Sequence, residues 1–276
     1  MNDKAEERVA RFYNTLGWTT EDGVTEDARR WEDLREHARE YVGKCRLRVL
    51  RHVPDSGENI LDMASGPIQY IEYLEYSRNF HRRYCVDLSL RALEQAKKRI
   101  GDHGVFLHGS FLSIDMESDF FDCAVSLHTI YHIDKDQQEA AVRKLVGLVK
   151  PGKPVIIVYS NPNIFYARLL KRLKRMIGVR GTQSTRTEDA SLYFHAHPIE
   201  WWSRYRDIAD VQILPWRSLT SNAQKKLIPD NRIGKAMLRA LFNLEDRFSG
   251  FFVNHFQYPM VVLTKKAPQG SVGVCG

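Results

Sequence analysis

The 276-residue sequence has few cysteines and no long apolar segment. The longest run without a charged residue, Pro154–Ala167, is shorter than the roughly 18 residues of a membrane span and contains Pro, Asn and Ser. The charged start MNDKAEERVARF lacks the apolar region typical of a secretory signal. The cysteines lie far apart and form no CxxC pair, which argues against a disulfide framework and a zinc site: Cys45, Cys85, Cys123 and Cys275. These absences predict a cytoplasmic protein.

The composition is that of an ordinary globular protein. Apolar residues make up 43% of the chain and charged residues 27%, which excludes disorder and collagen-like character. The net charge of +7 permits an anionic partner without requiring one. We therefore expect a mildly basic enzyme.

Apolar strand-like and amphipathic helix-like segments alternate after residue 57. The predicted helices are Ile68–Tyr76, one that begins after Ser89, and Lys135–Val149. Such alternation predicts an α/β fold with a doubly wound, mostly parallel seven-stranded sheet, helices on both faces and an antiparallel last strand. The predicted strands are Asn59–Met63, Arg83–Leu88, Val105–His108, Asp122–Leu127, Val155–Tyr159, Val211–Trp216 and Tyr258–Thr264.

The pattern divides the chain into four stretches. Residues 1–57 are expected to form a helical lid, and residues 58–160 the ligand-binding core. Residues 161–266 are expected to continue the same domain with inserted helices and the last strands, on the substrate side. Residues 267–276 are expected to be a disordered tail.

Two strand ends carry the residues that indicate a ligand site. The first predicted strand ends in Asp62, and the small-residue turn Ala64-Ser65-Gly66 leads into a helix. Such a turn lets the backbone approach a nucleotide-like ligand, and the N–H groups at the helix start suit an anion. The second strand ends in Asp87, whose carboxylate can accept both hydroxyls of a ribose.

These segments resemble the class I S-adenosylmethionine-dependent methyltransferases. The resemblance covers about residues 58–160 and rests on five segments in family order: ILDMASGP, CVDLS, HGSFLSID, FFDCAVSLHTIYHI and LVKPGKPVIIVYS. The family motif is usually D-x-G-x-G-x-G; here Ala64 and Ile68 replace the first and third glycines. The resemblance implies S-adenosyl-L-methionine as cofactor and methyl transfer as the reaction.

The resemblance also assigns cofactor contacts residue by residue. Asp62, Ala64 and Gly66 would face the methionine part, and Asp87 the ribose. The base and the chain leading to the methyl group would be contacted by Leu88, Ser110, Phe111 and His128. Ser110 departs from the Asp that the family commonly places near the adenine amino group.

Other nucleotide enzymes fit less well. The turn after the first strand lacks the G-x-G-x-x-G of dehydrogenases and the G-K-[ST] of phosphate-binding loops. Asn161-Pro162-Asn163 follows the fifth strand and lacks the aromatic residue that stacks on a flipped base. A methyltransferase-like module without catalysis stays an alternative because two motif glycines are missing.

Methyl transfer from a sulfonium needs alignment of the acceptor and exclusion of water, and no metal is expected. Asp134 and Asp136 are interpreted as helix caps rather than metal ligands. A hydroxyl acceptor would benefit from a base, and His128 and His132 lie in the loop after the fourth strand. His195 lies in the next loop, as does His197.

The remaining features concern the acceptor. Tyr13, Trp18 and Trp31 are candidate lid residues. The helix expected at 165–177 has a basic face that suits solvent, an anionic acceptor or weak membrane-surface contact. The pairs Trp201-Trp202 and Phe251-Phe252 suggest apolar pocket walls, so we expect O-methylation of a small or carrier-linked hydroxylated molecule, with a sugar of polysaccharide biosynthesis as the leading candidate. RNA is the alternative, although no nucleic-acid module is evident.

Overall fold

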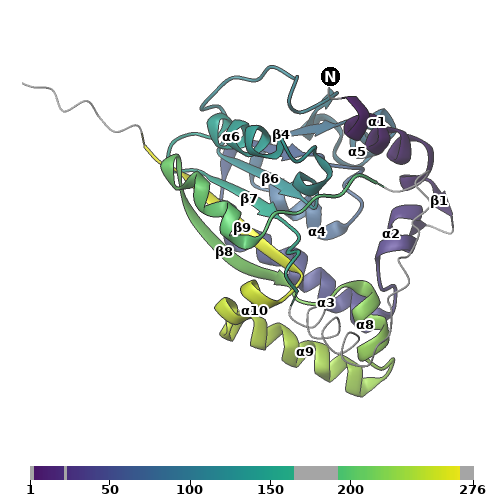
Figure 1. Cartoon of the computed structure of the whole chain (residues 1–276). Coiled ribbons are helices and arrows are strands. Elements are labelled where there is room, and N and C mark those ends of the chain that lie inside the picture. Colours follow the sequence, from purple (N-terminus) through teal and green to yellow (C-terminus); the bar gives the residue numbers. More distant parts are fainter. Residues whose placement is uncertain (1–2, 22–23, 165–191, 268–276) are drawn as a thin grey trace, which may run out of the picture.

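A computed structural model describes residues 3–21, 24–164 and 192–267 (Figure 1). Seven strands form one sheet in the order β5-β4-β3-β6-β7-β9-β8. Strands β3 to β7 pair in parallel, and β9 is antiparallel to both neighbours, which confirms the predicted fold. The bounds are β3 Gly57–Met63, β4 Phe80–Asp87, β5 Gly104–His108, β6 Cys123–Leu127, β7 Pro154–Val158, β8 Ala209–Arg217 and β9 Tyr258–Lys265.

The direction of strand addition reverses at β3. The chain moves outward from β3 through β4 to β5, and then β6 returns to pair with the other side of β3. In open α/β sheets, ligands bind at such a reversal, outside the carboxyl ends of the strands. The site is therefore expected where β3, β4 and β6 end.

Helices cover both faces of the sheet. One face packs against α6 (Gln138–Leu148) and the 3-10 helix Ile199–Asp207. The other packs against α3 (Glu36–Leu47), α9 (Arg232–Arg247) and, under β4, α5 (Leu90–Ile100), whose first turn is capped by the Ser89 hydroxyl as predicted. Figure 1 shows α6 and α9 on opposite sides of the sheet. The smaller helices are α4 (Ile71–Leu74), α8 (Ser221–Leu227) and α10 (Ser249–His255).

The amino-terminal stretch forms α1 (Asp3–Phe12), a π-helical turn (Tyr13–Gly17), a short hairpin and α2 (Glu26–Trp31). The hairpin strands are β1 (Thr20–Glu21) and β2 (Val24–Thr25). A 3-10 turn, Arg48–Arg51, follows α3. The helical character predicted for 1–57 is thus largely present, and the hairpin is an addition.

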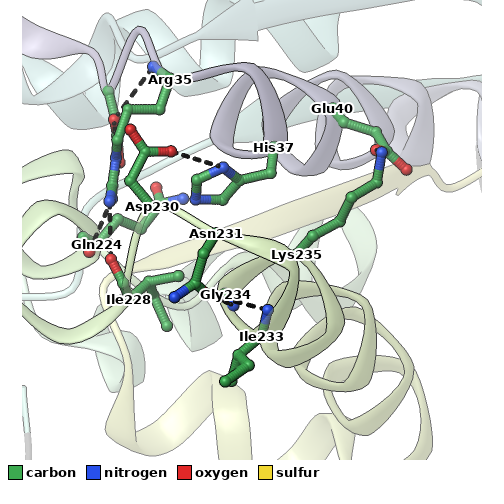
Figure 2. A network of polar contacts seen from close by, with 11 residues as sticks. Arg35, His37, Glu40, Gln224, Ile228, Asp230, Asn231, Ile233, Gly234 and Lys235 are labelled. Atoms are coloured by element: carbon green, nitrogen blue, oxygen red, sulfur yellow. Dashed lines mark hydrogen bonds and ion pairs between the residues drawn. The ribbon is translucent and has the colours of Figure 1, made fainter.

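Polar contacts fasten α3 to the late helices (Figure 2). The Arg35 guanidinium donates to the carbonyls of Ile228 at 2.7 Å and Gln224 at 3.1 Å. Lys235 lies 2.9 Å from Glu40, and Nδ1 of His37 lies 3.3 Å from Asp230. These contacts join the segment before the sheet to the segment between its last two strands.

Several sequence predictions differ from the structure. The helix expected over Ile68–Tyr76 begins only at Ile71, because Ile68 has a φ of 52° and belongs to the preceding turn. Trp202 is fully buried against Tyr159 and Tyr205 in the core, so the Trp201-Trp202 pair forms no pocket wall. The expected basic helix 165–177 lies outside the described residues, as does nearly all of the tail 267–276.

The described residues contain no helix that is long and apolar enough to cross a membrane. Cys45, Cys85 and Cys123 are buried free thiols, and burial raises the pKa of Cys45 and of Cys85 to about 12. These thiols are therefore protonated and unreactive at neutral pH.

Candidate functional site

The turn after β3 keeps a left-handed backbone at alternate residues. The φ angles are 57° at Ala64, 55° at Gly66 and 52° at Ile68. These are the three glycine positions of the motif, so the two replacements keep the glycine conformation at the expense of strain. The Ala64 N–H donates to the Val86 carbonyl at 2.7 Å, which ties the turn to β4.

Asp62, expected to face the cofactor directly, is held by a buried arginine. Nε of Arg83 lies 3.1 Å from Oδ2 of Asp62, and Nη2 of Arg83 also pairs with that oxygen. Nη1 of Arg83 donates to the Tyr73 carbonyl at 2.6 Å. Sequence reasoning missed Arg83, although a charged residue inside a strand is a signal for such a pair.

Asp87 lies at the carboxyl end of β4, and its carboxylate connects two loops. Oδ2 accepts from the Gly66 N–H and Oδ1 from the Ser89 N–H, each at 2.8 Å. Burial raises the pKa of Asp87 to about 6, against the effect of these two hydrogen bonds. Each carboxylate oxygen has a second lone pair, so Asp87 can still accept two ligand hydroxyls.

A cavity of about 180 Å³ lies over the strand ends and contains most of the predicted site. Asp87, Leu88 and His132 line both this cavity and a neighbouring slot of about 50 Å³. Phe111 lines the slot but not the larger cavity. The large cavity brings together these predicted residues: Tyr13, Trp18, Asp62, Ala64, Gly66, Asp87, Leu88, His128 and His132.

The amino-terminal segment closes the cavity with two of the three predicted lid residues. Tyr13 and Trp18 stack with ring centroids 4.9 Å apart, and a Cβ at Gly66 would lie 3.1 Å from the Trp18 ring. Trp18 Nε1 is buried without a hydrogen-bond partner among the described residues. Trp31 is 53% exposed and does not line the cavity, so the structure does not bring this third residue to the site.

Asp27 also faces this cavity, and sequence reasoning missed it. Burial raises the pKa of its carboxyl to about 7, the Glu32 carboxylate acts in the same direction, and hydrogen bonds from Gln69 and Tyr13 oppose the rise. Its signal in the sequence is weak because acidic residues are common in the first turn of a helix.

The two candidate bases differ in their surroundings. Nδ1 of His132 lies 2.6 Å from the Tyr193 carbonyl, which can only accept, so Nδ1 carries the proton and Nε2 holds a lone pair. Burial lowers the pKa of His132, so this side chain is neutral at pH 7.

The His128 side chain packs against aromatic rings and is poorly suited to act as a base. Its φ is 60°, and its ring meets the Trp216 and Tyr258 rings edge-on, with centroids 4.7 and 5.3 Å away. Burial lowers the pKa of His128 to about 3, with the charge of Arg217 adding to the effect. It is therefore a weak base, and the geometry favours His132.

Ser110 reaches the slot only through another residue. Its hydroxyl donates to Oε1 of Glu6 at 2.7 Å, and Glu6 lines the slot. Asp134 accepts from the Asp136 N–H at 3.0 Å in the turn before α6. The described residues hold no cluster of three or more potential metal ligands.

The geometry fits an adenosyl cofactor. Asp87 sits where the two cavities join, so a ribose there would place a base in the apolar slot and an amino-acid chain in the larger cavity. The unpartnered Trp18 Nε1 offers a donor beside that chain. Gly66 keeps the turn free of a side chain that would collide with Trp18.

Comparisons with known proteins agree with the fold and the motifs. Residues 61–157 match a family model described as a methyltransferase domain. No curated protein matches the sequence.

Solved structures with the same fold are distant in sequence. Phosphoethanolamine N-methyltransferase 2 of Haemonchus contortus is 15% identical with a TM-score of 0.53; the match covers 81% of this chain and 53% of that one, about half its length. The N-methyltransferase NodS of Bradyrhizobium japonicum is 11% identical, with a TM-score of 0.55 and coverage of 96% and 99%. Geranyl diphosphate C-methyltransferase of Streptomyces coelicolor is 14% identical, with a TM-score of 0.54 and coverage of 95% and 97%.

The matched segment contains the strained turn after β3, Asp87 at the end of β4 and the loop with His128 and His132. The mostly parallel seven-stranded sheet and its antiparallel last strand are those that the sequence predicted. The chain thus carries a methyltransferase domain over residues 61–157 and has the fold of the S-adenosylmethionine-dependent methyltransferases.

Proposed function

We propose that this methyltransferase acts on a hydroxyl group of a small or carrier-linked molecule, with His132 as the general base. The observation that supports this most is the hydrogen bond between His132 Nδ1 and the Tyr193 carbonyl, at 2.6 Å. It leaves the unprotonated Nε2 as the free ring nitrogen of a residue that lines the cavity.

When bound, S-adenosylmethionine supplies an electrophilic methyl group on a sulfonium. Asp87 holds the ribose, and the strained turn with Gly66 holds the amino-acid end. Tyr13 and Trp18 cover the cavity and exclude water. His132 Nε2 would take the proton of the acceptor hydroxyl as its oxygen bonds to the methyl carbon and the methyl–sulfur bond breaks, which leaves a neutral thioether.

A sugar is our leading acceptor, because other aromatic residues than the Trp201-Trp202 pair line the cavity. The aromatic residues Tyr13, Trp18 and Tyr73 line the cavity, and Trp202 does not. Aromatic faces suit the apolar side of a sugar ring, and the hydroxyls would meet Asp27 and His132.

An amine acceptor is the second candidate, and Asp27 favours it. Among the described residues, no cationic side chain forms an ion pair with this carboxyl, which lies in a cavity lined by aromatic residues. A carboxylate beside aromatic faces suits an ammonium group. The Haemonchus contortus enzyme and NodS are N-methyltransferases and the Streptomyces enzyme is a C-methyltransferase, so the acceptor atom must be tested directly.

The test is a transfer assay with methyl-labelled cofactor against fractionated cell extract. We expect label in a small-molecule fraction, on oxygen, and a turnover about 10²–10⁴-fold lower for His132→Gln. Label on nitrogen would establish the amine reading. Label in RNA, with binding that falls steeply between 50 and 200 mM salt, would overturn the small-molecule proposal. Cofactor binding without transfer to any fraction would favour a non-catalytic module.

A further inference from the structure

The apolar slot beside Asp87 receives one ionisable side chain from far away in the sequence. Glu6, on α1, lines the slot together with Leu88, Phe111 and Leu112. Asp87 and His132 also line the slot, but both are shared with the larger cavity. Among the described residues, Glu6 is therefore the ionisable group that lines the slot without also lining the larger cavity.

Glu6 is held in place by Ser110, which acts as a positioning residue. The Ser110 hydroxyl donates to Oε1 of Glu6 at 2.7 Å and accepts from the Leu112 N–H at 3.3 Å. Both ends of this serine are thereby used, so its hydroxyl has no donor left for a ligand. The Glu6 carboxylate keeps further lone pairs, including those of Oε2.

We propose that Glu6 accepts a hydrogen bond from the exocyclic amino group of an adenine ring in the slot, which makes α1 a lid that reads the base. The inference rests on the proposed cofactor. A ribose on Asp87 directs its base into the slot, where Leu88 and Phe111 supply the apolar contacts. A carboxylate accepts from an amino group but has no donor for a 6-oxo group.

It follows that recognition of the adenine ring and closure of α1 over the cavity occur together. α1 leads directly into the turn with Tyr13, and Tyr13 stacks on Trp18 over the Gly66 turn. The same α1 contacts the turn that carries His132. A purine without the amino group would lose the Glu6 contact and leave this lid less firmly held.

The test compares binding of S-adenosylhomocysteine with that of its 6-oxo analogue, S-inosylhomocysteine, by calorimetry. We expect the full-length protein to prefer the adenine compound by about 10- to 100-fold, the range of one hydrogen bond to a charged group. Glu6→Ala should weaken binding of the adenine compound and bring the ratio close to one. Glu6→Gln, whose amide can donate to the 6-oxo group, should reverse or abolish the preference.

Two variants sharpen the result. Glu7→Gln alters the exposed neighbour and should keep the wild-type ratio. Ser110→Asp in the Glu6→Ala background places a carboxylate beside the position that Glu6 leaves and should restore the preference for adenine. The ratio is measured within each variant, so a general loosening of the lid does not change it.

Equal weakening of both compounds by Glu6→Ala would show that Glu6 merely packs the lid and would overturn the proposal. A Glu6→Ala variant that binds both compounds as the wild type does would also overturn it. If the wild-type protein binds neither compound at millimolar concentration, the cofactor assignment itself fails, and this result is distinct from the other two.

Discussion

Arg83 and Asp62 form a buried ion pair between β4 and β3, with Arg83 Nε 3.1 Å from Asp62 Oδ2. The side chains are 2% and 5% exposed. Because Arg83 also donates to the Tyr73 carbonyl, one guanidinium joins two strands to the helical turn beside the cavity. The acidic residue of the motif is thus part of the framework that shapes the site.

Arg83→Met should destabilise the fold strongly. It leaves the Asp62 charge buried without a partner, which typically costs about 3–5 kcal/mol in the free energy of unfolding. Asp62→Asn combined with Arg83→Met should cost less than Arg83→Met alone. Urea unfolding measures the free energy of unfolding of each variant. Arg143→Met, at the exposed pair with Asp207, is the control and should cost under about 1 kcal/mol. Equal effects at both pairs would contradict the buried pair.

Ala64→Gly should not destabilise the protein, and a gain of up to about 1 kcal/mol is expected, because alanine is strained at a φ of 57°. Ala92→Gly, inside α5, is the matched control and should cost about 1 kcal/mol because that alanine has ordinary helical geometry. The same urea experiment compares the two. A loss at position 64 as large as that at position 92 would show that the turn is not left-handed there.

The sequence predicted the strands closely because buried parallel strands are short apolar runs with clear ends. It also predicted Asp87 and the loop with His132, which follow strands directly. It could not predict Glu6 or Asp27 at the site, because tertiary packing brings the amino-terminal segment over the strand ends. Nor could it separate His132 from His128, since their difference lies in the Tyr193 carbonyl, about sixty residues further along.

The pH dependence of turnover should identify the base. Burial lowers the pKa of His132, so it stays neutral down to a pH below 6.5, and kcat/KM should fall only under that value. With the cofactor held at saturation, so that protonation of Asp87 does not limit turnover, His132→Gln should lose this acidic limb and keep its affinity for S-adenosylhomocysteine. His128→Asn, tolerated at a φ of 60°, should keep the limb. A limb that disappears in His128→Asn instead would reverse the assignment.

Asp27 should make stability depend on pH. Its folded pKa of about 7 exceeds the ordinary value of 3.8, so between these values the folded state holds a proton that the unfolded state has lost. Stability from this group is therefore present below pH 4 and is lost as pH rises through 7. The melting temperature of Asp27→Asn relative to wild type should rise between pH 5 and pH 8. The neighbouring Glu26→Gln is the control, and a difference that stays constant with pH would contradict a buried Asp27.

The most direct test is calorimetric titration of S-adenosylhomocysteine into wild type and Asp87→Ala. We predict binding at one site, weakened at least tenfold by Asp87→Ala through loss of hydrogen bonds worth about 1.5–3 kcal/mol each. Burial raises the pKa of Asp87 to about 6, and hydroxyls donate best to the ionised carboxylate, so wild-type affinity should also fall below pH 6. Asp115→Asn, an exposed carboxylate, should bind as wild type does. Absence of binding at millimolar cofactor, or unchanged affinity in a folded Asp87→Ala, would contradict the assigned site.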